Sequence, residues 1–179
     1  MYTVLGFDPS LASSGFAYQD EEGCHTGRIT SKKLRGVERL DFIQRSFLEL
    51  MDKVYVLTGR LDLIVYEGYA MGTMGGKGRF FDIGELGGVL KLVAWDMGVD
   101  VLLVPPSNLK QFATGKGNAK KEQVIQAVAD VWGYDVPQND EADAFALLKM
   151  GEAYLAARKP RASHRAKALQ SCMLLKGRN

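Results

Sequence analysis

Residues 2–8 read YTVLGFD, a short apolar run that ends in an aspartate. The segment over residues 15–30, GFAYQDEEGCHTGRIT, continues the strand-like pattern and carries turn-forming residues at its centre. We therefore predict three strands joined by tight turns, with DEEG at 20–23 as the second hairpin turn. Strands connected by such short turns pair antiparallel.

Helix and strand patterns alternate after this hairpin series. From residue 36 to residue 57 apolar residues recur every three or four positions, which is typical of an amphipathic helix. Residues 61–68, LDLIVYEG, are apolar on both faces, as a central parallel strand is. The remaining expected elements are a helix over 81–97, a strand over 99–106, a short helix near Leu109, and helices over about 119–132 and 138–151. These elements predict an α/β fold, with a mixed five-stranded sheet and helices on both faces.

Length and charge indicate one domain followed by a basic tail. The chain has 179 residues, of which 46% are apolar and 25% charged, as in one globular domain. Residues 158–179 hold seven of the 23 basic residues and none of the 21 acidic ones. We predict a domain over 1–157 and a basic tail over 158–179, which either contacts an anionic polymer such as nucleic acid or is a solvated terminus.

No segment has the pattern of a membrane anchor or a secretion signal. No apolar run approaches the roughly 20 residues that span a bilayer, and the N-terminus lacks the basic start of a signal peptide. Cys24 and Cys172 are too few for a disulfide framework, so we interpret them as reduced thiols. We expect a cytoplasmic protein without a membrane partner.

Two acidic residues close predicted strands. Asp8 ends the first strand and Glu67 ends the fourth. Ligands of open α/β sheets collect beyond the carboxyl ends of strands, so the two acids come close together if these strands are parallel neighbours. A half-buried acid needs a partner, and because no Lys or Arg flanks either position, a divalent cation is a candidate. The alternative for Asp8 is a turn that it begins with Pro9.

The helix over 138–151 begins with three acids, Asp140, Glu141 and Asp143. Asp140 and Asp143 are three residues apart and lie on one helical face, whereas Glu141 is turned away by about 100°. Without a nearby His or Cys, these two acids together with Asp8 and Glu67 form an oxygen donor set that suits Mg²⁺ or Mn²⁺. Two ions about 4 Å apart would activate water for phosphodiester hydrolysis. The alternative is stabilisation of the helix dipole, and this is our interpretation of Glu141.

Taken in order, these segments resemble the RuvC-type Holliday junction resolvases of the ribonuclease H-like superfamily. LGFDPSLASSGFA at 5–17, LIVYEGYA at 63–70 and NDEADAFALL at 139–148 are similar to the acidic motifs of that family. VPPSNLKQFATGKGNAKKEQV at 104–124 resembles its lysine-bearing segment. The resemblance implies a ribonuclease H-like fold and a homodimer that nicks four-way DNA junctions with Mg²⁺, for which Mn²⁺ substitutes. It also implies catalytic and metal-binding roles for Asp8, Glu67, Asp140 and Asp143.

The lysine-bearing segment is expected to hold the DNA backbone. Lys110 and Lys121 match basic residues of the family, and Lys116 and Lys120 add charge beside them. Independently of the family, the loop over 114–121 has glycines that let amides approach a phosphate and lysines that neutralise it. The alternative is a solvated charged loop.

The segment after Glu67 departs from the bacterial members. The family places an aromatic wedge here, and Tyr69 is the nearest candidate. The glycine-rich loop, which includes Lys77 and Arg79, and the run GRFFDIGELGG at 78–88 look more like phage-encoded members, which accept a wider range of branched DNAs. Such a member would act in the host cytoplasm.

Small residues in the helix over 81–97 give some support to the dimer. Gly84, Gly87 and Gly88 permit close helix approach, although packing on the domain's own sheet would explain them equally well. We interpret Trp95 and Trp132 as core or interface anchors.

Three other functions fit parts of the pattern. GFDPSLASSG also resembles the phosphate loop of actin-like sugar kinases, but those enzymes need two such domains and 179 residues cannot supply both. A non-cleaving DNA-binding module would not need all four acids. A nuclease of the same superfamily that acts on flaps, forks or RNA–DNA hybrids is the closest alternative.

Overall fold

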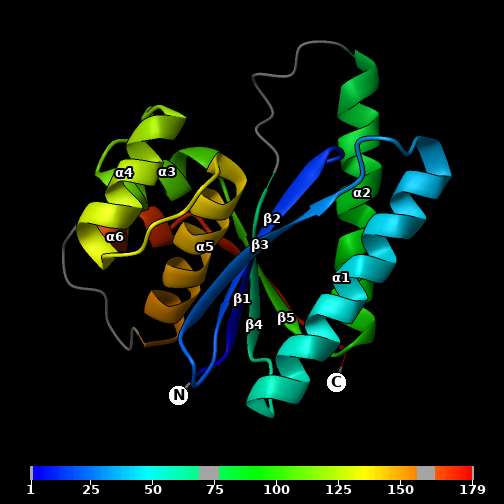
Figure 1. Ribbon diagram of the computed structural model, residues 1–179, viewed down its shortest axis with the longest axis horizontal. Coiled ribbons are helices and arrows are strands. Elements are labelled where there is room, and N and C mark those ends of the chain that lie inside the picture. The colour runs from blue at the N-terminus through cyan, green and yellow to red at the C-terminus, as the bar shows by residue number, and fades with distance from the viewer. Residues whose placement is uncertain (1, 69–76, 157–163, 179) are drawn as a thin grey trace.

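The computed structural model describes residues 2–68, 77–156 and 164–178, without the side chains of 77–80. Its described strands form one mixed sheet in the order β3-β2-β1-β4-β5-β6 (Figure 1). The strands are β1 (Val4–Asp8), β2 (Ser13–Gln19), β3 (Cys24–Thr30), β4 (Leu63–Glu67), β5 (Asp100–Val104) and β6 (Met173–Leu175). As predicted, β1, β2 and β3 pair antiparallel, while β1, β4 and β5 pair parallel.

The prediction of five strands was wrong, because the tail adds a sixth. The apolar segment at 173–175 pairs antiparallel with β5, with Val101 opposite Leu175 and Leu103 opposite Met173. An exposed edge of a buried parallel strand leaves unpaired backbone groups, and β6 satisfies them on β5. A three-residue apolar run within a basic tail is too short to show the periodicity that predicts a strand.

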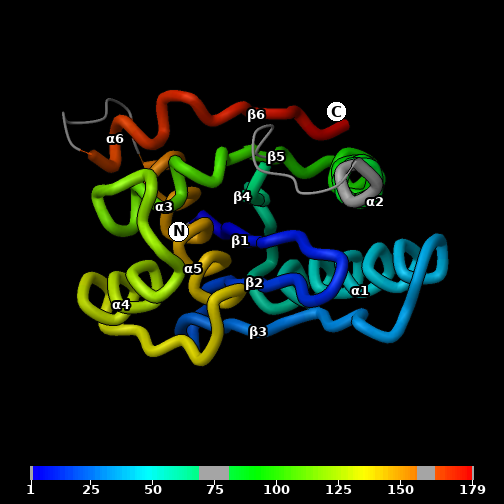
Figure 2. Tube along the Cα trace, turned by 90° about the horizontal axis from the view of Figure 1, so that it is seen from above, coloured from blue at the N-terminus to red at the C-terminus, as the bar shows by residue number. Residues whose placement is uncertain are grey.

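Helices cover both faces of the sheet, as predicted (Figure 2). They are α1 (Gly36–Thr58), α2 (Lys77–Asp96), α3 (Pro106–Thr114), α4 (Lys121–Trp132), α5 (Asn139–Ala156) and α6 (His164–Leu169). Alternate residues of the central strands point to opposite faces, so Leu5 and Phe7 join the core beneath α1 and α2. Val4, on the other face, joins the core formed with α3, α4 and α5.

The helical stripes explain which faces are buried. In α1 the predicted apolar stripe is buried at Ile43, Phe47, Met51 and Val54. Trp132 packs between Phe112 and Phe145, with ring centroids 6.2 and 5.9 Å away, and is a partly buried side chain against the core.

Helix α5 lies unusually close to the strands that carry the site. A Cβ on Gly6 would fall 2.1 Å from the carbonyl oxygen of Ala144, and a Cβ on Gly15 would fall 1.9 Å from that of Asp140. Gly151, on α5 itself, lies equally close to the sheet, since a Cβ there would lie 2.5 Å from the side chain of Val4. These three glycines let α5 sit directly on β1 and β2, and so set the height of its first turn above the sheet.

We predict that Gly15→Ala destabilises the protein by about 1–3 kcal/mol and lowers its activity, because α5 must move away from β2. Chemical unfolding would measure the loss. Gly68→Ala adds the same methyl group where the nearest atom is 3.6 Å away, so it is the matched control. Equal stability of the two variants would contradict the close packing of α5.

The described part of the tail is folded onto the domain. Ala166 and Ala168 of α6 are buried, and α6 packs against α3. Lys176 pairs with Asp100 at 2.7 Å, and Arg178 pairs with Asp96 at 3.1 Å while its guanidinium lies 4.0 Å from the centroid of the Trp95 ring. These contacts lie at the start of β5, so the last cations of the tail are engaged within the chain. A boundary at residues 157 and 158 stays a prediction. Across the described residues, no helix has the length and apolarity to cross a membrane.

Candidate active site

Asp8 and Glu67 end neighbouring parallel strands. Phe7 of β1 lies in register with Tyr66 of β4, so the next residue on each strand is an acid. Both acids lie at the edge of the sheet that is formed by the carboxyl ends of β1 and β4. The core side chains of both strands are buried up to this point, and the two acids stand where the burial becomes partial. The charge of Glu67 raises the pKa of Asp8, so the two acids act on each other.

Asp143 completes an acidic trio with Asp8 and Glu67. One carboxylate oxygen from each of the three lies within 4.8 Å of the others, and each residue is half-buried. Asp143 reaches this point because the first turn of α5 rests on Gly15, which is paired with Asp8 across β1 and β2. Asp140 stands apart from this group, yet its charge still acts on both Asp8 and Asp143.

Burial and mutual repulsion raise the pKa values of the acidic trio. Desolvation raises the pKa of Glu67 to about 7, with the charge of Asp143 adding to it. Desolvation also raises the pKa of Asp143 to about 6. The pKa of Asp8 is well above its usual value, first through burial and then through the charges of Glu67, Asp143 and Asp140.

Two of the predicted lysines act on these acids. Lys110 on α3 and Lys121 at the start of α4 each lower the pKa of Glu67 and of Asp143. Their charges therefore reach the acidic trio. Lys116 and Lys120 lie in the intervening loop, where both are exposed.

Glu141 points away from the acidic trio, as its spacing predicted, but it is buried. It is 7% exposed, its Oε1 lies 3.8 Å from Nε of Arg28, and its Oε2 has no hydrogen-bond partner among the described residues. Arg28 pairs with Gly15 in the sheet, so Glu141 approaches the edge strand β3. A charge that only stabilised the start of the helix would be solvated. The sequence spacing predicted which way this side chain points but not that it is buried.

Three predicted DNA-binding residues have no described side chain. Tyr69 lies outside the described residues, and Lys77 and Arg79 lie in the first turn of α2, where only the backbone is described.

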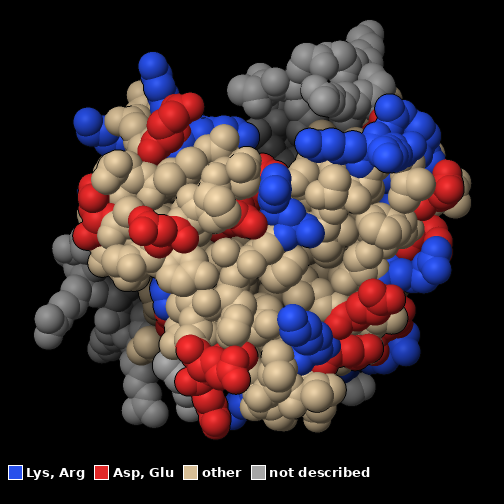
Figure 3. Space-filling model, in the orientation of Figure 1, with Lys and Arg blue, Asp and Glu red and all other residues tan. Residues whose placement is uncertain are grey.

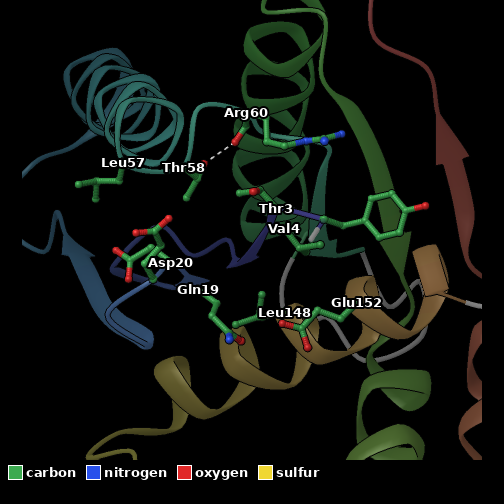
Figure 4. A pocket seen from close by; sticks show the side chains of 11 residues that line it. Thr3, Val4, Gln19, Asp20, Leu57, Thr58, Arg60, Leu148 and Glu152 are labelled. Atoms are coloured by element: carbon green, nitrogen blue, oxygen red, sulfur yellow. Dashed lines mark hydrogen bonds between the residues drawn. The ribbon is translucent and has the colours of Figure 1, made fainter.

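A cavity of about 340 Å³ lies at the opposite end of β1 and holds none of the acidic trio (Figure 4). Its charged lining is largely paired: Asp20 with His25 at 2.8 Å, Glu152 with Lys149 at 3.0 Å, and Arg60 with Asp62. Paired charges on a partly apolar wall favour no reaction, so the candidate site is the edge that carries the trio.

The acidic trio could bind a divalent cation. Its donors are all carboxylate oxygens, which suit hard cations, and the trio is the group with metal-ligand spacing found among the described residues. The raised pKa values of these acids are what convergent carboxylates show when no cation balances them.

Sequence reasoning missed Gly6, Gly15 and the Arg28–Glu141 contact. Glycines at alternating positions of buried strands were the available signal, because a missing side chain there marks close approach of another backbone.

The chain matches one protein family over most of its length. The model of the family described as Crossover junction endodeoxyribonuclease RuvC matches residues 4–149. A protein of that name from Hydrogenovibrio crunogenus is 26% identical over 159 residues, covering 85% of this chain and 88% of the relative. A protein of the same name from Natranaerobius thermophilus is 25% identical, and the match covers 80% of this chain and 90% of the relative.

Solved structures share the fold. Thermus thermophilus RuvC superposes with a TM-score of 0.67 at 22% identity, covering 86% of this chain and 95% of the other. The T. thermophilus RuvC structure in complex with a Holliday junction substrate gives a TM-score of 0.69 at 20% identity, covering 88% and 97%. These relatives are bacterial, so a phage origin gains no support from them.

Proposed function

Because the chain belongs to the RuvC family of crossover junction endodeoxyribonucleases, we propose that it resolves four-way DNA junctions by hydrolysing one phosphodiester bond on each of two opposed strands. The observation that supports this most directly is the acidic trio at the edge where β1 and β4 end. Its position beside Lys110 and Lys121 suits a substrate that brings a phosphate to acids and cations together.

We propose that Asp8, Glu67 and Asp143, with Asp140 beside them, hold two Mg²⁺ ions, and that Mn²⁺ can replace Mg²⁺. Such ions supply a water of lowered pKa and stabilise the leaving oxygen. Lys110 and Lys121 favour the ionised acids, since each lowers the pKa of Glu67 and Asp143.

The DNA backbone is proposed to lie along α3, the following loop and the start of α4. Lys110, Lys116, Lys120 and Lys121 would contact its phosphates. Tyr69 as the wedge, and Lys77 and Arg79 as contacts, belong to the same proposal by family resemblance.

We propose a homodimer formed by the outer face of α2. Along this face Gly84 and Gly88 have open space beside them, and Leu92 and Trp95 are 57% and 42% exposed. Large exposed apolar side chains beside glycines on one helix suit close packing against a second helix. Two copies would place two acidic sites on one junction, which paired cuts require.

A cleavage panel with Mg²⁺ tests the function: an end-labelled four-way junction, flap, fork, linear duplex and RNA–DNA hybrid of matched sequence. Symmetric paired nicks confined to the junction are expected. Equal cutting of flaps and forks would indicate a broader branched-DNA nuclease, and preference for the hybrid a ribonuclease. Binding without cutting in Mg²⁺ and in Mn²⁺ would indicate a non-cleaving module.

A further inference from the structure

A second group of cations follows strand β3. We call it the β3–α1 surface; it consists of Lys32, Lys33, Arg35 and Arg39. Residues 32–39 carry these four cations and a single acid, Glu38. No ion pair engages any of the four among the described residues, and Lys32 and Lys33 are both exposed.

The β3–α1 surface lies at the same edge of the sheet as the acidic trio. Strand β3 is antiparallel to β2, and β2 is antiparallel to β1, so β3 and β1 end at one edge. Ser31 ties this end of β3 to the loop after Asp8, since its amide donates to the carbonyl of Ala12 at 3.0 Å and its hydroxyl to that of Leu11 at 2.8 Å.

The acidic trio therefore stands between two basic segments. Strand β3 is two strands from β1 on one side, and β5, which leads into α3, is two strands away on the other. At about 4.8 Å between strands, each segment begins roughly 10 Å to the side of Asp8. Figure 3 shows basic side chains at this edge both over the start of α1 and over α3 and α4.

Cations elsewhere are used differently. Arg60 pairs with Asp62 before β4, and Lys176 pairs with Asp100 at the start of β5, both at the opposite edge. Among the described residues, the four cations of the β3–α1 surface thus lack the ion pairs that neutralise Arg60 and Lys176. Such a distribution attracts a polyanion to this edge.

The segment is held in shape without neutralising its charge. Arg35 donates from Nη1 to the carbonyls of Lys32 and Leu34, at 2.7 and 2.8 Å, and Arg39 donates from Nε to the carbonyl of Leu34 at 2.8 Å. Carbonyl partners fix these guanidinium groups while leaving their full positive charge. The first turn of α1 behind them has no side-chain cap.

We propose that the β3–α1 surface binds DNA phosphates on the side of the scissile bond opposite Lys110 and Lys121. The trio would then receive a strand whose backbone is gripped on both flanks of the cut. This inference rests on the proposed function, because it assumes that the phosphate to be cut enters the acidic trio.

Lys32→Ala/Lys33→Ala tests the proposal, with Arg45→Ala/Lys53→Ala as a control that removes two cations further along α1. Binding of a labelled four-way junction is measured in EDTA across a salt series. Each phosphate contact contributes about 0.9 to the slope of log K against log salt, so the Lys32/Lys33 variant should lose roughly 2 from that slope and at least about tenfold in affinity at 0.1 M salt. The control and Lys32→Arg/Lys33→Arg should keep the slope.

Methylphosphonate substitution identifies the flank. Neutral linkages on one side of the cut should weaken wild-type binding and leave the Lys32/Lys33 variant unaffected, while linkages on the other side should weaken both. An unchanged slope, or an equal loss in the control, overturns the proposal even if the wild type resolves junctions. A wild type that cuts no junction instead overturns the proposed function.

Discussion

Replacing Asp143 with Asn should reduce junction cleavage by at least about 1000-fold, because bound divalent ions contribute several kcal/mol to such a transition state and each 1.36 kcal/mol is tenfold in rate. The amide keeps the size of the carboxylate but removes one charged ligand from the acidic trio. Asp8→Asn should behave in the same way, since Asp8 and Asp143 meet within one group.

Glu141→Gln is the matched control, as it removes a neighbouring charge from the same helical turn. Glu141 faces Arg28 rather than the trio, so we expect cleavage within a few-fold of wild type. Single-turnover rates with saturating enzyme give the comparison, and DNA binding in EDTA should be retained by all three variants. Comparable losses in Asp143→Asn and Glu141→Gln would contradict our assignment of the site.

Asp143→Asn and Asp8→Asn should also stabilise the metal-free protein. Burial first, and then the charges of Glu67, Asp143 and Asp140, raise the pKa of Asp8, so its ionised form opposes folding. Asp8→Asn relieves that repulsion, and for a chain of this size each kcal/mol gained raises Tm by about 2–4 °C. Opposite changes in activity and stability are expected of a binding site and would not arise from general damage to the fold.

The sheet and the acids could be predicted because their signals are local. Buried strands such as β4 are continuous apolar runs, and an acid that closes such a run is conspicuous. Asp8 and Glu67 converge simply because β1 and β4 are parallel neighbours, which strand order decides. Asp143 follows from helical spacing once α5 is placed over the same edge.

The remaining features depend on contacts between distant segments. The strand β6 is three residues long and becomes a strand only because β5 offers an open edge. The depth of Glu141 depends on α5 resting on Gly15, a closeness that helical periodicity does not encode. The ion pair of the tail residue Lys176 likewise depends on the tail folding back beside Asp100. Composition alone predicted that the tail cations face solvent or DNA.

The cleavage rate should rise as pH increases through about 6 to 7. This pH dependence should be steeper at lower Mg²⁺ concentrations. Glu67 and Asp143 have pKa values of about 7 and 6, and carboxylates must lose their protons to bind metal. Protons and Mg²⁺ therefore compete for the acidic trio. Raising Mg²⁺ should move the midpoint of the profile to lower pH, and EDTA should abolish cleavage at every pH.

The free energy of unfolding of the metal-free protein should have the opposite pH dependence to the cleavage rate. The folded pKa values lie above the ordinary 4.5 of Glu and 3.8 of Asp, so between pH 4 and 7 the folded state binds more protons than the unfolded state. The free energy of unfolding should fall as pH rises through this window and then level off. Added Mg²⁺ should restore stability above pH 7, where it binds the ionised acids.

Lys121→Met separates this titration from general effects of pH. Lys121 lowers the pKa of both Glu67 and Asp143, so its removal should shift the midpoint of cleavage to higher pH. Lys53→Met, on the exposed surface of α1, serves as the charge-matched control and should leave the midpoint in place. Single-turnover rates at saturating enzyme, from pH 5 to 9 and at two Mg²⁺ concentrations, distinguish the outcomes. A midpoint that ignores both Mg²⁺ and Lys121 would show that the titrating group lies outside the acidic trio.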